Sequence, residues 1–136
     1  MAKSFSAQAQ AFLREKRFAV LATLNQDGTI QQTTMWYLLE DDGTIMMNTK
    51  VGRLKERNLR RDQRISICVE DGYSYISING PVELIDDQET AQHDIYRLSE
   101  RYHGPDKARK QMEEQFSHEQ RVTLRLTCEK IHEYLD

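Results

Sequence analysis

The stretch Phe18–Leu39, FAVLATLNQDGTIQQTTMWYLL, decides the fold. It opens with a short, continuously apolar run over Phe18–Leu24, and the Asp-Gly pair within Asn25–Gly28 is a turn signal. Thr29–Leu39 then resumes as a second strand, so the stretch predicts an antiparallel hairpin. A second acidic turn, EDDG, leads into an apolar segment at Thr44–Thr49. The first 49 residues therefore predict a three-stranded meander.

The rest of the chain alternates between helical and strand-like patterns. We expect helices over 7–16, 52–61, 86–102 and 106–116, and strands over 65–70, 73–79, 82–85 and 121–127. Gly80-Pro81 is expected to interrupt its strand, and the 121–127 alternation predicts a half-buried last strand. With no repeat or linker in the sequence, these elements predict one domain over residues 1–136. The expected fold class is mainly β, a six-stranded antiparallel barrel with short peripheral helices.

Composition excludes several classes of protein. No apolar run approaches the roughly 20 residues of a membrane helix, and the first residues lack the apolar core of a signal peptide, so we expect a cytoplasmic protein without membrane contact. The sequence pI of about 5.8 disfavours a general nucleic-acid binder. Cys68 and Cys128 share no Cys-x-x-Cys spacing, which predicts reduced thiols rather than a disulfide or a zinc site.

One basic segment stands out in this acidic chain. Between Lys50 and Arg64 the net charge is +5, whereas the whole chain carries −3, which leaves −8 elsewhere. The segment follows a strand and opens a helix, whose free amides and dipole favour an anion. Lys55, in the first helical turn, would oppose that dipole unless an anion lies between them. A binding site for an anion and a merely solvated basic helix face remain equal alternatives at this point.

No catalytic motif accompanies this segment. The sequence contains no nucleophile-elbow, zinc-protease, Walker or dinucleotide-binding signature, and its four histidines have no ligand-like spacing, so no metal is expected. Tyr73 or Tyr75 could supply a proton, but the sequence ranks neither, and the catalytic residues stay unknown. Trp36 could line a planar ligand or belong to the barrel wall.

Several short motifs together resemble a known family. They are Phe18–Leu24 with Asp27-Gly28, the Thr33–Trp36 strand, Asp42–Ile45 leading to Asn48-Thr49, Gly52-Arg53-x-Lys55-x-x-Asn58-Leu59 with Arg64, Tyr75–Gly80, and Arg121–Leu126. In this order they resemble the pyridoxamine 5'-phosphate oxidase-like split barrels, and most of all their deazaflavin-dependent branch. The resemblance implies a homodimer with two sites at the dimer interface for a flavin or for the deazaflavin coenzyme F420.

The resemblance also assigns roles to residues. Lys55 would pair with the cofactor phosphate, assisted by Arg53 and Thr49, while Asn58 would hold the turn. The strand beside the ring system would comprise Gln32, Thr33, Thr34, Met35 and Trp36. The sequence departs from flavin-using oxidases of the family, because it has no Arg or Lys between Thr29 and Met47. This departure favours F420 over FMN. A solvent-facing basic surface, formed by Lys50, Arg57, Arg60 and Arg61, would suit the oligoglutamyl tail of F420.

The resulting function hypothesis is an oxidoreductase. In it, reduced F420 would pass hydride to a small conjugated organic substrate, with the protein supplying position and electrostatics. One alternative is an FMN-dependent oxidase or flavin reductase on the same fold, and another is a non-catalytic carrier of flavin or haem. A nucleic-acid module is disfavoured, because Lys50–Arg64 contains no aromatic residue for base stacking.

Overall fold

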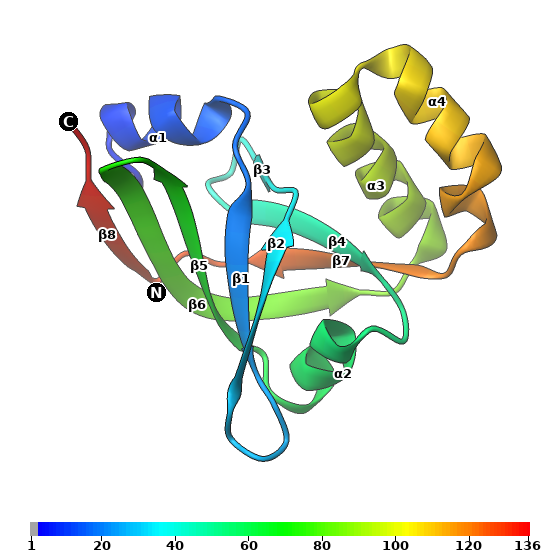
Figure 1. The fold of residues 1–136 in the computed structure, drawn as a ribbon, viewed down its shortest axis with the longest axis horizontal. Helices are drawn as coiled ribbons and strands as arrows, with labels where there is room; N and C mark the ends of the chain where they lie inside the picture. Colours follow the sequence, from blue (N-terminus) through cyan, green and yellow to red (C-terminus); the bar gives the residue numbers. More distant parts are fainter. Residues whose placement is uncertain (1–2) are drawn as a thin grey trace.

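The computed structural model describes residues 3–136, and it folds this part of the chain into one curled antiparallel sheet with helices around it (Figure 1). The strands are β1 (Ala19–Leu24), β2 (Ile30–Met35), β3 (Leu38–Leu39), β4 (Ile45–Lys50), β5 (Arg64–Asp71), β6 (Ser74–Ile85), β7 (Arg121–Leu126) and β8 (Lys130–Tyr134). The helices are α1 (Ala7–Arg14), α2 (Leu54–Arg61), α3 (Gln88–His103), α4 (Pro105–Glu114) and the 3-10 turn η1 (Phe116–His118).

The long strand β6 organises the sheet. Strand order is β2-β1-β5-β6-β7-β4-β3, with β8 also pairing with β6. The first part of β6 pairs with β5 on one edge and with β8 on the other, and its last residues, Val82–Ile85, pair with β7. The curl encloses a core that includes Leu21, Ile67, Ile78 and Leu124. The predicted mainly β, antiparallel split-barrel class is therefore confirmed, although residues 3–136 contain eight strands rather than six.

The predicted interruption at Gly80-Pro81 is wrong. β6 continues through both residues, which pair with Ile65 and Arg64 of β5. The segment joining β7 to β8 passes directly over Gly80, and a Cβ built there would lie 1.9 Å from the carbonyl oxygen of Thr127. Glycine is required at this position because another backbone approaches it closely.

The predicted strand over 29–39 is divided in two. β2 pairs with β1, whereas the two residues of β3 pair with β4, so the chain changes partner around Tyr37. The buried Tyr37 hydroxyl donates to the carbonyl of Leu13, and its amide donates to the hydroxyl of Tyr102 at 3.2 Å. These tertiary bonds fix the change of direction. The strand β8 was not predicted, since most of its residues are exposed and carry no strong apolar alternation.

Helix α3 packs on the outer side of β4 and β7, and α4 packs on α3 (Figure 1). Ile45 and Met47 of β4 face the barrel core, while Met46 packs against Ile95 and Leu98 of α3. For the same reason β7 is buried along nearly its whole length, Arg121 and Thr123 included. The expectation of a half-buried strand is wrong because α3 covers the second face of β7.

Two local predictions are confirmed, the acidic turns and the side-chain cap at the start of α3. Gly28 and Gly43 adopt φ of +87° in the two acidic turns, and the Asp87 side chain caps α3 by accepting from the Thr90 amide at 3.1 Å. Cys68 and Cys128 are unpaired. Within residues 3–136 no helix has the length and apolar character needed to span a membrane, and no cluster of metal-binding side chains is found.

Candidate cofactor site

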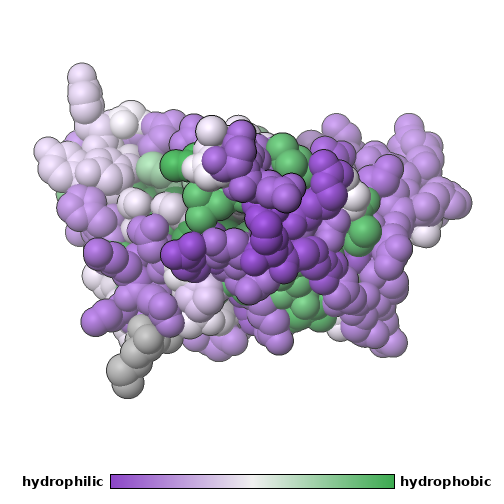
Figure 2. All heavy atoms as spheres, turned by 90° about the horizontal axis from the view of Figure 1, so that it is seen from below, coloured by the Kyte–Doolittle hydropathy of each residue, from purple (hydrophilic) through white to green (hydrophobic). Residues whose placement is uncertain are grey.

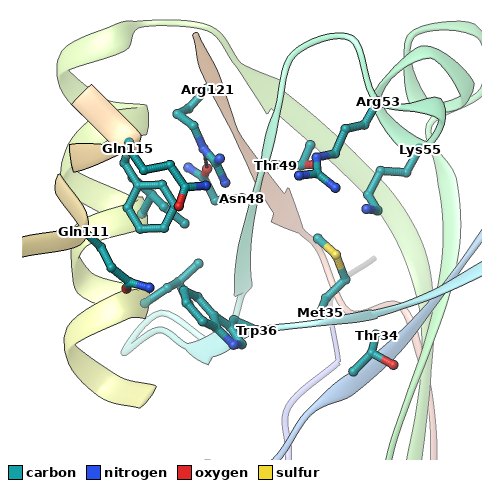
Figure 3. Close-up of a pocket in the computed structure, with 13 residues that line it drawn as sticks. Thr34, Met35, Trp36, Asn48, Thr49, Arg53, Lys55, Gln111, Gln115 and Arg121 are labelled. Carbon is teal, nitrogen blue, oxygen red and sulfur yellow. Dashed lines mark hydrogen bonds between the residues drawn. The ribbon is translucent and has the colours of Figure 1, made fainter. Parts of the chain in front are cut away.

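An open cavity of about 310 Å³ lies between the end of β2, the start of α2 and the α3–α4 pair. Its lining residues are Thr34, Met35, Trp36, Asn48, Thr49, Arg53, Lys55, Ile95, Leu98, Gln111, Gln115, Phe116 and Arg121. Figure 3 shows the cations Arg53 and Lys55 on one side of this cavity and the amides Gln111 and Gln115 on the opposite side. The lining in this chain contains no carboxylate. The cavity therefore presents positive charge without an internal counter-ion.

Lys55 is the most unusual residue of the site. It is only 8% exposed, and its ammonium has no hydrogen-bond or ion-pair partner among residues 3–136. Burial lowers the pKa of Lys55 below its ordinary value, and the neighbouring charges of Arg53 and Arg121 lower it further. A buried cation with cations beside it is costly unless an anion enters. The site is thus arranged for a negatively charged group.

The local structure of α2 places Lys55 there. The Glu56 carboxylate accepts from the Gly52 amide at 2.9 Å and pairs with Nε of Arg60 at 2.7 Å, which fixes the first turn of the helix. Arg53 is the N-cap residue, yet its side chain does not cap the helix. The Glu56 amide donates to the Arg53 carbonyl at 3.1 Å, whereas the amides of Leu54 and Lys55 have no acceptor among the described residues, and the helix dipole is positive at this end. The N-terminus of α2 and the side chains of Arg53 and Lys55 therefore all favour a negatively charged ligand.

Arg121 supplies a third cation from the start of β7. Its Nε donates to Oδ1 of Asn48 at 3.0 Å, and its Nη1 donates to Oε1 of Glu119 at 2.7 Å. Phe116 lies under the guanidinium, 5.0 Å from ring centroid to Cζ. Nη2 has no hydrogen-bond partner in the described part of the chain. Burial lowers the pKa of Arg121, but an arginine retains its charge. One edge of the guanidinium is therefore left for a ligand.

Asn48 orients this arginine. Its Nδ2 donates to the Ala91 carbonyl at 2.9 Å and to the Thr123 hydroxyl at 3.3 Å, so its Oδ1 faces Arg121. Thr123 in turn donates to the buried Asp94 carboxylate at 2.8 Å. The position of Arg121 is thus set by contacts between α3, β4 and β7.

Trp36 forms a flat wall at the end of β2. Its ring stacks on Tyr102 at 5.3 Å between centroids, and the His103 ring meets it edge-on at 5.2 Å. Partial desolvation lowers the pKa of His103, and the charges of Lys107 and Lys16 lower it further, which favours the neutral imidazole. Aromatic rings held by such contacts keep a fixed orientation. The indole is a rigid surface on which a planar group can stack.

The structure brings together six of the nine predicted cofactor-binding residues: Thr34, Met35, Trp36, Thr49, Arg53 and Lys55. Gln32 and Thr33 lie earlier on β2 and do not line the cavity. Asn58 is buried away from it and donates to Asn25 at 2.9 Å and to Thr23 at 3.1 Å. Asn58 therefore ties α2 to the hairpin.

Neither proposed proton donor lines the cavity. Tyr73 lies in the β5–β6 turn and is 86% exposed. Tyr75 packs against His132 and Tyr134 of β8, with ring centroids 5.7 and 5.8 Å away. In this chain both tyrosines are remote from the cavity lining, and no general acid is assigned.

Sequence reasoning missed the wall made by β7, α3 and α4. The missed lining residues are Asn48, Ile95, Leu98, Gln111, Gln115, Phe116 and Arg121. Asn48 had been noted only as part of a motif. The one available signal was an arginine at the start of an apolar strand, where a charge is unusual.

The four residues of the predicted solvent-facing basic surface, Lys50, Arg57, Arg60 and Arg61, are all exposed, but two of them are paired with carboxylates. Arg60 forms two hydrogen bonds with Asp86, at 2.8 and 2.6 Å, besides its bond to Glu56. Lys50 lies 3.7 Å from Glu119. Figure 2 shows hydrophilic side chains over the hairpin tip and α2, with smaller hydrophobic patches between them. Much of the positive charge counted along the sequence is therefore neutralised by carboxylates from other segments.

Arg57 and Arg61 remain on the outer side of α2. They line a groove between α2 and the β1–β2 turn, together with Asn25, Gln26, Asp27, Leu54 and Asn58. Arg57 donates to the Gly52 carbonyl at 2.6 Å, and Arg61 donates to the Leu24 carbonyl. These two arginines form no ion pair within the described residues, and with the single carboxylate of Asp27 beside them the groove keeps a net positive charge.

Solved structures share this architecture. The conserved hypothetical protein Rv2991 from Mycobacterium tuberculosis is 29% identical, with a TM-score of 0.82 over 98% of this chain and 86% of that one. A protein described as an F420 reductase is 26% identical, with a TM-score of 0.70 over 90% of this chain and 94% of that one. General Stress Protein 26 from Bacillus anthracis, at 14% identity and a TM-score of 0.66 over 91% and 88%, shares the fold.

The family model described as pyridoxamine 5'-phosphate oxidase matches residues 5–134, which include every strand and helix described above. Flavin-type cofactors are bound by this family, and the buried, unpaired Lys55 beside Arg53 fits the phosphate that such cofactors carry. The chain belongs to the pyridoxamine 5'-phosphate oxidase family.

Proposed function

We propose that this protein is an oxidoreductase that uses reduced F420 to transfer hydride to a small conjugated organic substrate. The observation that carries the proposal is Lys55, a largely buried lysine without a counter-ion among the described residues, which lines the cavity together with Arg53 and Arg121. A phosphate diester would supply the missing negative charge.

The residues of the cavity divide the work of binding. Lys55 and Arg53 would hold the phosphate, with the Thr49 hydroxyl as a further donor. The end of β2, from Thr34 to Trp36, would lie along the ring system. When bound, the reduced deazaflavin supplies the hydride. The chain's own residues bind and orient the two reactants and provide a positive environment for their negative charge.

Two observations support F420 over FMN. A structural neighbour at 26% identity is described as an F420 reductase. β2 also lacks the basic residues that bind the FMN phosphate and the substrate in flavin-using oxidases of the family. We place the oligoglutamyl tail in the groove of Arg57 and Arg61, because Lys50 and Arg60 are paired with carboxylates. Exposed charges of this kind attract the tail through solvent, with a strength that falls as salt rises.

We further propose that the working unit is a homodimer. The outer side of β1 and β2 carries Phe18 at 54% exposure and Ile30 at 64% exposure, next to the half-buried Val20, Ala22 and Leu24. Figure 1 shows β1 and β2 in front of the other strands, with the helices placed around the edges. An uncovered apolar sheet face of this kind is suited to association with a second copy.

Cofactor titration tests the proposal. Trp36 is the sole tryptophan, and it lines the cavity, so quenching of its fluorescence reports binding there. We expect F420 to bind more tightly than FMN at low salt, and we expect this advantage to shrink when the tail is removed or when Arg57 and Arg61 are both replaced by glutamine. Tighter binding of FMN would select the FMN-dependent alternative. Binding without turnover of any conjugated acceptor would select the carrier.

A further inference from the structure

A chain of hydrogen bonds runs from the cavity to α3. Nε of Arg121 donates to Oδ1 of Asn48 at 3.0 Å, and Nδ2 of Asn48 donates to the Thr123 hydroxyl at 3.3 Å. The Thr123 hydroxyl donates to Oδ2 of Asp94 at 2.8 Å. Asp94 is 4% exposed and does not line the cavity, whereas Arg121 and Asn48 do (Figure 3). The chain therefore connects a cation of the cavity to a carboxylate that lies outside it.

The two ends of this chain fix the direction of every bond in it. An arginine side chain can only donate, so Asn48 turns its oxygen to Arg121. A carboxylate can only accept, so the Thr123 hydroxyl donates its one proton to Asp94 and accepts from Asn48. The Ala91 carbonyl, which accepts from Nδ2 of Asn48 at 2.9 Å, requires the same orientation of the amide. No bond in the chain can reverse without placing two donors or two acceptors face to face.

An ion pair holds Asp94 from its other side. Oδ1 of Asp94 accepts from Nη1 of Arg97 at 3.2 Å, and Arg97 forms two further bonds with Glu40, at 2.8 and 2.6 Å. The carboxylate therefore has one oxygen for Arg97 and the other for Thr123. Because both neighbours are donors, Asp94 fixes the end of the chain as an acceptor.

Glu119 competes with this chain for Arg121. Its Oε1 accepts from Nη1 of Arg121 at 2.7 Å, and its Oε2 lies 3.7 Å from Nζ of Lys50. While Asn48 holds Nε, Glu119 bonds to one nitrogen only, and Nη2 has no partner among the described residues. A guanidinium released from Asn48 can turn and pair with both oxygens of Glu119, the geometry that arginine and carboxylate favour. An arginine paired in this way offers less charge to a ligand.

From this geometry we infer that Asp94 is a positioning residue for the binding of an anion by Arg121. Acting through Thr123 and Asn48, it holds the guanidinium in the orientation that leaves Nη2 to a ligand. The inference rests on the proposed function, in which a phosphate enters the cavity. It adds a residue that controls this binding from outside the cavity.

Asp94→Asn tests the inference, because it replaces an acceptor by a donor with almost no change in volume. Arg97 retains the oxygen of the new amide, so the NH2 group of that amide faces Thr123. The Thr123 hydroxyl then receives two NH2 groups, and its own proton has no acceptor. Asn48 can accept that proton only by turning its oxygen away from Arg121.

Charge and position predict opposite results for this variant. Removal of a carboxylate near several cations tightens anion binding if Asp94 acts by its charge alone. We expect the opposite, a weakening of inorganic pyrophosphate binding of about fivefold at low salt, as the loss of one hydrogen bond produces. Arg121→Met should weaken this binding more strongly. Asp94→Asn should then change the affinity by less than about twofold in the Arg121→Met background, since the two residues act as one unit.

The binding of pyrophosphate is measured by titration calorimetry in the wild type, the two single variants and the double variant, and F420 binding is measured by quenching of Trp36. Glu40→Gln is the matched control, because it removes a carboxylate from the same ion pair and leaves the bonds of Thr123 in place. It should leave the affinity for pyrophosphate within about twofold. If Asp94→Asn does not fold, judged by circular dichroism, Thr123→Val takes its place, and Thr123→Ser should restore the wild-type affinity.

Three results would overturn the inference: tighter or unchanged pyrophosphate binding in Asp94→Asn, an equal loss in the Arg121→Met background, or no pyrophosphate binding by the wild-type protein. If the two residues are coupled in pyrophosphate binding but F420 does not bind, the positioning role stands and the proposed cofactor is wrong. If F420 binds and the two substitutions act independently, the cofactor stands and the positioning role is wrong. The two proposals therefore fail separately.

Discussion

Replacing Lys55 by methionine should have opposite effects on cofactor binding and on stability. Lys55 is largely buried, and the charges of Arg53 and Arg121 lower its pKa, so removal of the charge relieves a repulsion in the cofactor-free protein. Methionine keeps most of the apolar stem that packs in the first turn of α2. The free energy of unfolding without cofactor should therefore rise.

Binding of a phosphate-bearing cofactor should weaken in the same variant. A hydrogen bond between ions contributes on the order of 1.5–3 kcal/mol, which corresponds to a rise in Kd of about 10- to 150-fold. The pH dependence of stability is a second test of the role of Lys55, independent of cofactor binding. The pKa of Lys55 is lower in the folded state than in the unfolded chain, so the folded state binds fewer protons between the lowered value and about 10.5. The wild-type protein should gain stability as pH rises through this interval, and Lys55→Met should not show this gain.

The assay is urea unfolding at pH 7 and pH 10, combined with fluorescence titration of F420. Lys110→Met is the matched control, because Lys110 is exposed on α4 and does not line the cavity. It should change neither stability nor affinity. The reasoning is refuted if Lys55→Met lowers stability and leaves the Kd unchanged, because Lys55 would then be a structural residue whose charge is already satisfied.

Four further expectations follow from the packing. Arg60→Ala breaks a partly exposed ion-pair network, so it should lower the free energy of unfolding in urea by about 1 kcal/mol and leave the Kd of the cofactor within about twofold. A loss of affinity equal to that of Lys55→Met would mean that the cations of Lys50–Arg64 attract the cofactor collectively rather than through one binding site. Gly80→Ala should prevent folding or lower the melting temperature severely, because its Cβ would lie 1.9 Å from the Thr127 carbonyl oxygen; a near-native circular dichroism melt would contradict this. Hydrogen bonds from the side chain and the backbone amide of Arg64 lower the pKa of Asp62 to about 2, below the unfolded value near 3.9. The contribution of Asp62 to stability should therefore be complete above about pH 4 and should disappear as pH falls towards 2, and Asp62→Asn should flatten that part of the acid-unfolding curve. Ile30→Asp should shift the protein from dimer to monomer in sedimentation without lowering its helix and strand content, and an unchanged sedimentation coefficient would remove this face from the proposed interface.

Local physics explains the parts of the fold that could be predicted. The hairpin depends on a short apolar run, an Asp-Gly turn and a second run, all within 22 consecutive residues. Glycines with positive φ terminate these strands at positions where other residues would be strained. α2 likewise follows from a run of strong helix formers. Lys55 could be predicted from the sequence as an anion-binding residue, because a lysine at a helix N-terminus is unfavourable without an anion beside it.

The pairing of charges could not be predicted from their positions along the chain. Arg60 meets Asp86 from the end of β6, and Lys50 meets Glu119, which precedes β7. The net charge summed over Lys50–Arg64 leaves out these carboxylates, because they lie about 26 and 69 positions further along the sequence than Arg60 and Lys50. The continuity of β6 at Gly80 also depends on a distant segment, the chain after β7.

The sequence by itself determined the turns, the hairpin, α2 and the cationic side of the candidate site, because each depends on neighbouring residues. The tertiary structure alone decided that Asn48 orients Arg121, that the Ser99 hydroxyl meets the Gln111 side chain, and that residues of α3 and α4 form the second side of the cavity. The physical reason is that hydrogen-bond periodicity and turn geometry act over a few residues. Burial and side-chain partnership depend on which surfaces meet once the sheet has curled, and those surfaces come from segments far apart in the chain.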